Sequence, residues 1–235
     1  MPGIDPAELK KAIEAGTCSE YDIDLRSQKI DRINNLDAYP KLRALNLGFN
    51  AIRKIEGLGR LLDLRQIQLY NNEIASTAGL GGLSKLEILY LHNNLIEELS
   101  DDFKTLKSLH TLRLDNNNVE NIESLSRCQK LTSLDLSQNR IANLTRFPAF
   151  TQLQFLDLSN NGIASVRPLA SCTALVELRL SSNKIDDLKS LRSLKKLQTL
   201  GKRIQTRKVF LCIAISCSST DLILPRFVMG FVTQD

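Results

Sequence analysis

The stretch LRALNLGFNAIRKI at residues 42–55 decides the fold, because the chain repeats it with a period of 22 residues. A period of this length is typical of solenoids, in which each unit stacks on the next. One copy comes a residue late, since residues 100–102 contain an insertion. A degenerate first copy, YDIDLRSQKIDRI, occupies residues 21–33, and an incomplete last copy starts at Leu197. The full copies begin at Leu42, Leu64, Leu86, Leu109, Leu131, Leu153 and Leu175.

Each copy contains the pattern LxxLxLxxN, followed by aliphatic pairs spaced IxxI or LxxL. The alternating apolar residues predict one short strand per copy with its apolar side turned inward. A single unit cannot bury its own apolar face, so stacked neighbours must build the core. We therefore expect residues 20–200 to form an α/β solenoid of eight to nine units. It should be a right-handed coil with a parallel β-sheet on the concave side and short helices or turns on the convex side.

An asparagine recurs at the end of each predicted strand, where the chain bends inward and backbone groups lose their sheet partners. A carboxamide has both donors and an acceptor, so it can bond to the backbone of its own and the adjacent repeat. Gln28 occupies the same place in the first copy. We expect a structural ladder made of Asn50, Asn72, Asn94, Asn117, Asn139, Asn161 and Asn183.

The two ends of the chain differ from the repeats. Residues 1–19 predict a capping helix over the first repeat, with Asp5 as N-cap, Glu8 completing a capping box, and Ile4 and Leu9 spaced as a hydrophobic staple. Residues 201–235 break the repeat pattern. They predict either an irregular C-terminal cap or an alternative end of the chain.

Composition narrows the compartment and the partners. The N-terminus has no basic segment followed by an apolar one, and no apolar run approaches the length of a membrane helix, so we expect neither secretion nor membrane insertion. Five cysteines without CxxC spacing predict neither a disulfide framework nor a zinc site. Cys128 and Cys172 fall at an apolar repeat position and should be buried, inert thiols. We expect a protein of the cytoplasm, the nucleus or the interior of a cilium.

The net charge of +5 does not predict nucleic-acid binding. Residues 201–235 contain five basic and two acidic side chains, which leaves 26 basic and 24 acidic in the first 200 residues. The predicted concave rows contain three arginines and no lysine, whereas direct binding would need basic residues gathered on one face.

The segment IRKIEGL at residues 52–58 resembles a signature, IxxIEGL, of the leucine-rich-repeat regulatory subunits of protein phosphatase 1. The 22-residue units as a whole are similar to the intracellular class of leucine-rich repeats. The resemblance implies a non-enzymatic scaffold that binds a serine/threonine phosphatase catalytic subunit as a monomer within a hetero-complex. Axonemal dynein light chains, other ciliary repeat proteins and a spliceosomal subunit share the same unit, so a ciliary adaptor or a spliceosomal-type subunit is the alternative.

Equivalent positions of successive strands should line up in rows on the concave face, about 4.8 Å apart. Aromatic residues of the kind that anchor interfaces gather over the second and third full copies. We call Tyr70, Ile88, Tyr90 and His92 the aromatic patch.

A second group of partner-binding candidates, the charged zone, follows over the later copies. Asp135 and Asp157 are neighbours there, and such a pair is destabilising unless a cation lies close. Flanking Arg113 and Arg179 could supply that cation, or a partner's Lys or Arg could; an exposed Phe155 beside them favours the second reading. The zone comprises Arg113, Asp115, Asp135, Phe155, Asp157, Glu177 and Arg179.

No catalytic constellation emerges from the sequence. His92 has no cysteine or other nucleophile near it in the repeat register, and an open, shallow face would not exclude water from Asp135 and Asp157. The glycines of GLGGLSKL at residues 79–86 belong to the repeat rather than to a phosphate-binding loop. We expect no enzyme activity, no metal and no cofactor.

Overall fold

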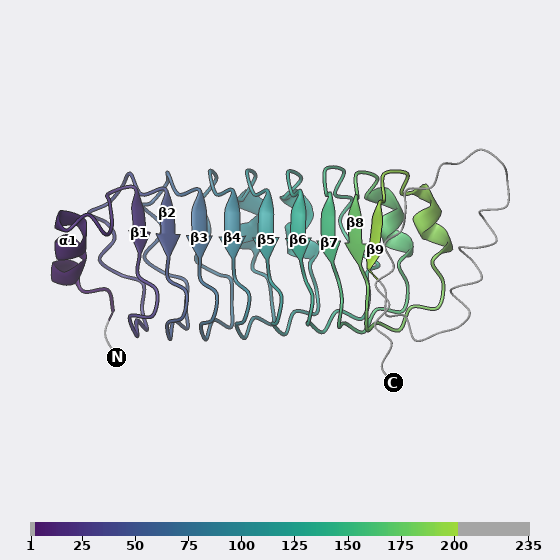
Figure 1. Cartoon of the computed structure of the whole chain (residues 1–235), viewed down its shortest axis with the longest axis horizontal. Coiled ribbons are helices and arrows are strands. Elements are labelled where there is room, and N and C mark those ends of the chain that lie inside the picture. Colours follow the sequence, from purple (N-terminus) through teal and green to yellow (C-terminus); the bar gives the residue numbers. More distant parts are fainter. Residues whose placement is uncertain (1–2, 202–235) are drawn as a thin grey trace, which may run out of the picture.

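The computed structural model describes residues 3–201, which form a single parallel β-sheet of nine strands. The strands stand side by side in sequence order, so the chain advances one repeat at a time along the long axis (Figure 1). The predicted parallel solenoid is confirmed. Its strands are β1 Asp22–Asp24, β2 Ala44–Asn46, β3 Gln66–Gln68, β4 Ile88–Tyr90, β5 Thr111–Arg113, β6 Ser133–Asp135, β7 Phe155–Asp157, β8 Glu177–Arg179 and β9 Thr199–Gly201.

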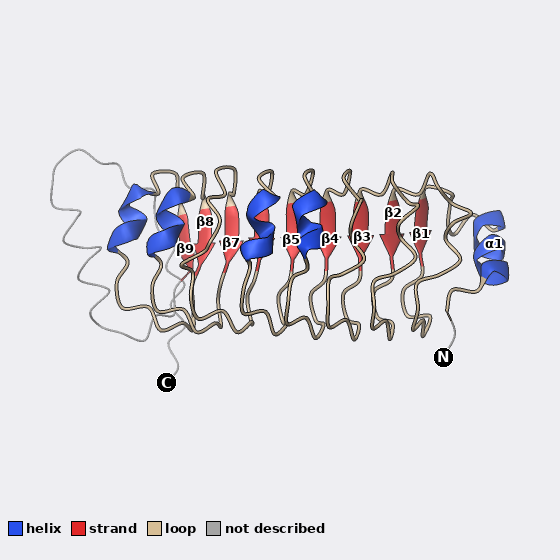
Figure 2. Cartoon of the chain, turned by 180° about the vertical axis from the view of Figure 1, so that it is seen from behind, coloured by secondary structure: helices blue, strands red, loops and turns tan. Residues whose placement is uncertain are grey.

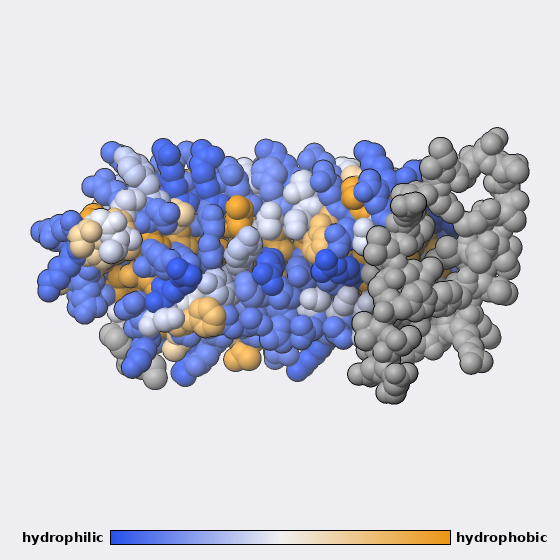
Figure 3. All heavy atoms as spheres, in the orientation of Figure 1, coloured by the Kyte–Doolittle hydropathy of each residue, from blue (hydrophilic) through white to orange (hydrophobic). Residues whose placement is uncertain are grey.

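In β1 to β8 the central residue points into the core, and its two neighbours lie on the outward side of the sheet. Leu89 pairs with Leu112 in the register between β4 and β5, which absorbs the one-residue insertion. Because every repeat contributes an aliphatic residue at this depth, the core is one continuous cluster along the whole body. The outward residues form the sheet face, the open surface that Figure 3 shows as mostly hydrophilic.

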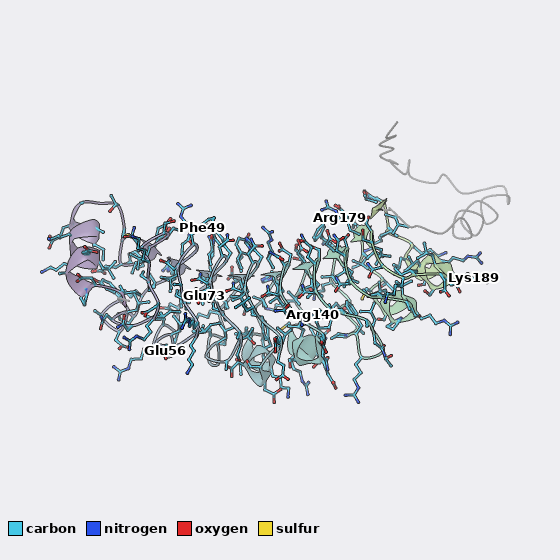
Figure 4. All side chains as sticks on the ribbon, turned by 90° about the horizontal axis from the view of Figure 1, so that it is seen from below. Phe49, Glu56, Glu73, Arg140, Arg179 and Lys189 are labelled. Carbon is cyan, nitrogen blue, oxygen red and sulfur yellow. The ribbon has the colours of Figure 1, made fainter. Side chains whose placement is uncertain are left out.

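The side opposite the strands has less regular structure (Figure 2). Among the described residues, four repeats return through a 3₁₀ helix: η1 Asp101–Thr105, η2 Glu123–Arg127, η3 Arg167–Ser171 and η4 Lys189–Ser193. The insertion enters at η1, where the Asp102 carboxylate accepts a hydrogen bond of 2.7 Å from the Gly79 amide of the previous repeat. In Figure 4 the strands lie on the inner side of a shallow arc and these helices on its outer side.

The helix α1 Pro6–Glu14 lies at the N-terminal end beside β1 (Figure 1). Ile4 and Leu9 are both buried, so α1 covers the apolar end of the first repeat. The Asp5 carboxylate accepts from the Ala7 amide at 2.8 Å. In a capping box the Asp5 carboxylate would accept from the amide of Glu8, three residues after the N-cap. It accepts from Ala7 instead, so the expected capping box with Glu8 is wrong, although Asp5 is the N-cap.

Each of the seven asparagines spans two repeats. The Asn94 Nδ2 donates to Leu91 O at 3.1 Å in its own repeat and to Leu69 O at 2.9 Å in the previous one, while its Oδ1 accepts from Ile74 N at 3.0 Å. The same three bonds recur at the other six positions. They are made by Asn50, Asn72, Asn117, Asn139, Asn161 and Asn183.

Gln28 does not act like these asparagines. Its side chain is exposed, and its Nε2 donates only to Arg26 O, at 3.3 Å within the same repeat. The first repeat instead receives its bonds from the next one, since Asn50 Oδ1 accepts from the amides of Gln28 and Ile30 at 3.0 Å. Gln28 therefore occupies the repeat position without making the ladder bonds, and the ladder begins at Asn50.

Within residues 3–201 no helix has both the length and the apolar character needed to cross a bilayer. The predicted C-terminal cap, residues 201–235, lies outside the described residues except for Gly201, which ends β9.

Candidate functional site

The aromatic patch is a packed group on the sheet face over β3 and β4. Tyr70 and His92, which follow these strands in adjacent repeats, stack in parallel with ring centroids 4.8 Å apart. Tyr90 meets His92 edge to face at 6.1 Å. Gly48 provides the room for this arrangement, because a Cβ there would lie 2.6 Å from the end of the Tyr70 ring. The rings are half-buried, so each still presents part of its surface to solvent.

The sequence analysis missed Phe49, which extends the aromatic patch toward the N-terminus. Its ring meets Tyr70 edge to face at 5.3 Å, and 55% of the residue is exposed. Figure 4 shows it on the same side of the molecule as Arg179. Its φ of +56° lies in the left-handed region, which costs an ordinary residue about 1–2 kcal/mol.

The sequence does contain a signal for Phe49, which is its position in the repeat directly before a ladder asparagine. Every later repeat has a polar residue there, and asparagine in particular tolerates positive φ through its short polar side chain. A bulky aromatic breaks this series in one repeat only. The equivalent residues, all with positive φ, are Asn71, Asn93, Asn116, Gln138, Asn160 and Ser182.

His92 has an unusual environment at the centre of the aromatic patch. Its Nδ1 is buried and has no hydrogen-bond partner among the described residues. Burial, and next the positive charge of Arg113, lower the pKa of His92 below its ordinary value of 6.5, while Asp115 acts in the opposite direction. The imidazole is therefore held in its neutral form near pH 7.

We predict that this histidine makes the stability of the protein depend on pH. As pH falls, the unfolded chain binds the proton before the folded one does, because the folded pKa is lowered. The stability contribution is thus fully present above the ordinary value of 6.5 and is lost as pH falls through the folded pKa. Melting temperatures between about pH 7.5 and about pH 5 should fall less steeply for His92→Phe, which keeps a ring but cannot titrate. Equal slopes for the two proteins would contradict the assignment.

The charged zone contains two arginines that are already paired. Arg113 binds Asp115 through two hydrogen bonds of 3.0 Å. Arg179 contacts Glu177 at 2.7 Å and reaches Asp157 at 3.6 Å. The expected compensation by flanking arginines is therefore realised for Asp157.

Asp135 is the exception in the charged zone, because no Lys or Arg among the described residues forms a salt bridge with it. The Ser137 amide and hydroxyl donate to its Oδ1 at 3.0 and 2.8 Å. Burial raises the pKa of Asp135, and the negative charges of Asp115 and Asp157 add to this effect against the hydrogen bonds from Ser137. The sheet face thus holds a half-buried carboxylate between two others; the charge of Arg113 acts on it from the neighbouring strand, but Arg113 forms its hydrogen bonds with Asp115.

Phe155 was expected to be exposed, and this is wrong. The residue is half-buried, and the Arg179 guanidinium carbon lies 5.2 Å from its ring centroid. A guanidinium at this distance interacts favourably with an aromatic face. Because a side chain of the same protein covers it, Phe155 is a weaker candidate for partner contact than Phe49.

A hollow of about 560 Å³ lies away from the sheet face, beside η1 and η2. Figure 4 places Arg140, one of its lining residues, below the sheet face and apart from Phe49 and Arg179. Glu98, Glu120 and Glu123 contribute to its acidic lining. Within residues 3–201 no group of three His, Cys, Asp or Glu side chains could hold a metal ion.

Cys128 and Cys172 are fully buried and free, as the repeat position predicts. Burial raises the pKa of Cys128 to about 12, so its thiol stays protonated and is a poor nucleophile. Neither cysteine contributes to the surface of the sheet face.

These features define a class of protein: an open parallel solenoid with one side-chain-rich face free to bind other proteins. A leucine-rich repeat family model matches residues 5–128, and two further leucine-rich repeat models match residues 127–144 and 151–193. The chain belongs to the leucine-rich repeat family. Repeats of this family typically serve as non-enzymatic scaffolds for protein–protein interaction.

Solved structures of bacterial proteins are similar to this chain. Internalin C2 from Listeria monocytogenes superposes with a TM-score of 0.76 at 25% identity, covering 83% of this chain and 92% of the internalin. A leucine-rich repeat protein of Leptospira interrogans gives a TM-score of 0.73 at 27% identity, covering 86% of this chain and 56% of that protein. No individually curated protein shows significant sequence similarity to the chain.

Proposed function

We propose that this chain is a non-catalytic scaffold that holds a partner protein on its sheet face. The observation that carries the proposal is the aromatic patch, in which Tyr70, Tyr90 and His92 are packed against one another yet left partly open to solvent. Tyrosine contributes strongly to protein interfaces because it has a large apolar surface and a polar end. A pre-packed group of this kind loses little entropy on binding.

For the partner, we propose the catalytic subunit of a serine/threonine protein phosphatase. The support is the resemblance of residues 52–58 to the signature of phosphatase regulatory subunits. Two buried free thiols suit a reducing compartment, which agrees with a role in the cytoplasm or nucleus. A dynein or other axonemal partner would instead support the ciliary alternative.

The test is affinity purification with mass spectrometry, using the wild-type chain and the double variant Tyr70→Ala/Tyr90→Ala. We expect the wild type to retain a partner in stoichiometric amount and the double variant to bind it roughly 30-fold more weakly, which corresponds to a combined loss of about 2 kcal/mol for the two tyrosines. Circular dichroism should show that the double variant stays folded, because the ladder and core are untouched.

The matched control is Arg140→Ala, which lies in the hollow away from the sheet face (Figure 4). It should keep full partner binding. Recovery of every partner by the folded double variant would refute binding through the aromatic patch. A phosphatase catalytic subunit among the partners would support the regulatory role, and its absence from all wild-type purifications would count against that role.

A further inference from the structure

Phe49 is held in a backbone conformation that favours asparagine or glycine, and its ring is nevertheless directed outward. A bulky residue at positive φ costs free energy, and more than half of this residue is exposed. Tyr70 is the aromatic ring that it contacts among the described residues. Strain of this kind at an exposed aromatic side chain points to a function outside the folded chain itself.

The Phe49 ring and Tyr70 form a continuous apolar corner over Gly48. The two rings meet at 84°, and the absence of a side chain at Gly48 lets the Tyr70 ring lie close to β2. Arg26 lies near the other end of Tyr70, because the Tyr70 side chain is one cause of the raised pKa of Arg26, after Asp24. A corner of this kind offers apolar surface to a side chain of a partner.

The charge of the sheet face indicates the second feature of the partner. The rows of β1 to β8 carry six acidic side chains and three arginines, although the whole chain has a net charge of +5. Arg113 and Arg179 are engaged by Asp115 and Glu177, so the local negative excess remains at Asp135. A Lys or Arg side chain of a partner would complement it.

The strands fix the distance between the two features. Neighbouring strands are about 4.8 Å apart, so β2 and β3, which precede the two rings of the corner, lie roughly 14–19 Å from β6, which carries Asp135. Extended chain covers about 3.3 Å per residue, so this distance corresponds to roughly four to six residues.

We propose that the sheet face binds an extended segment of its partner, laid across the strands, with an apolar or aromatic side chain on Phe49 and Tyr70 and a Lys or Arg on Asp135. This rests on the proposed scaffold function and adds the chemistry of the bound segment. Phe49 is then the anchor of the interaction, and Asp135 selects for positive charge.

The probes are fluorescein-labelled 14-residue peptides of Ser and Thr that carry one Phe and one Arg, with two to eight residues of separation, and matched peptides with Glu in place of Arg. Fluorescence polarisation with the full chain should give the tightest binding at a separation of four to six. The Glu peptides should bind at least tenfold more weakly. Equal binding of the Arg and Glu peptides, or no measurable binding by any peptide, would overturn the proposal.

Two variants test the residues. Phe49→Asn should weaken the best peptide at least tenfold while raising the melting temperature by about 2–4 °C, because asparagine relieves the strain. Asp135→Asn should remove the preference for Arg over Glu, whereas Glu120→Gln in the hollow on the far side should not. A higher melting temperature with weaker binding excludes unfolding as the cause. Unchanged peptide binding by Phe49→Asn would overturn the anchor.

The same variants separate this proposal from the scaffold function. If Tyr70→Ala/Tyr90→Ala loses its purified partner but Phe49→Asn and Asp135→Asn keep it, the scaffold function stands and the binding mode proposed here fails. If the double tyrosine variant keeps its partner, the scaffold function through this face fails first.

Discussion

Replacing Asn117 with leucine lowers the free energy of unfolding by about 3–5 kcal/mol, because the new side chain has nearly the same size but no polar atoms. The change leaves the amide of Ile96, now bound at 3.0 Å, without a partner. It also removes the bonds of 2.9 and 3.0 Å to the carbonyls of Leu91 and Leu114, which then keep only their bonds to Asn94 and Asn139. A buried amide left unsatisfied costs about 1–3 kcal/mol, and each of the two other lost hydrogen bonds adds about 0.5–1.5 kcal/mol. Asn117 is 8% exposed, so water cannot replace these bonds without opening the repeat.

Asn118→Leu is the matched control, one position further along the same turn. No side-chain hydrogen bond is made by Asn118 among the described contacts, and the equivalent residue of the previous repeat is an exposed leucine, Leu95. The control should therefore change stability by less than about 0.5 kcal/mol, as surface substitutions usually do. Urea unfolding measures both variants. Similar losses in the two would show that the asparagine hydrogen bonds are not what stabilises the turn.

Hydrogen exchange should locate the effect of Asn117→Leu. A solenoid is stabilised by contacts between adjacent units, so the loss should appear first at the amide of Ile96 and in the two repeats that the side chain joins. Unchanged exchange at Ile96 would contradict the bonding described here.

Substituting Gly79 by alanine has an effect of similar size for a different reason. Its φ is +107°, and a Cβ would lie 1.8 Å from the carbonyl oxygen of Ile55 in the previous repeat. Backbone must move to relieve this contact, and L residues rarely adopt that φ. We expect a loss of about 3–4 kcal/mol, at the upper end of the range for a strained backbone position.

Two other glycines allow the cost of the close contact to be measured apart from the cost of the backbone conformation. Gly82 has a φ of +89° but no atom within 4 Å of a Cβ, so Gly82→Ala should cost only the conformational part, about 1–2 kcal/mol. Gly59 has neither problem, so Gly59→Ala should be nearly neutral. Thermal unfolding should rank the losses Gly79 > Gly82 > Gly59. If Gly79→Ala were no worse than Gly82→Ala, the close approach of the two repeats would be absent in solution.

Gly57 occupies the equivalent place one repeat earlier, within the IRKIEGL segment, and the structure shows why this segment requires a glycine. Its φ is +68°, and a Cβ would lie 2.5 Å from the carbonyl oxygen of Ile33. A glycine at this position therefore permits close stacking of consecutive units, whatever partner the protein binds.

Sequence reasoning located the strands and the asparagines because both follow from needs that recur in every unit. Leu45 must face the core, and Asn50 must bond to the backbone groups that lose their partners where the chain bends. A fixed spacing therefore reveals both without any knowledge of side-chain conformation. The aromatic patch could be assembled for the same reason, since Tyr70 and His92 stand at equivalent positions of adjacent repeats.

The repeat spacing could not predict which of several nearby partners each side chain contacts. Arg113 could reach Asp135 in the next strand, but it binds Asp115, two residues along its own chain. Phe155 lies in an outward-facing row and is nevertheless covered by Arg179. Phe49 was missed because it follows the strand, where a left-handed residue turns its side chain out of the rows that alternation predicts.

The extra residue near Ser100 shows how differently the two long sides respond to a change in length. Asn117 bonds to a residue 26 positions earlier where the other ladder asparagines bond 25 earlier, yet its bond lengths are unchanged. The outer side absorbs the added length in a helical turn, and the inner side keeps its alignment. Insertions can therefore be accommodated on the outer side of the solenoid while the sheet face keeps its alignment. The binding surface and the size of the outer side can thus change independently.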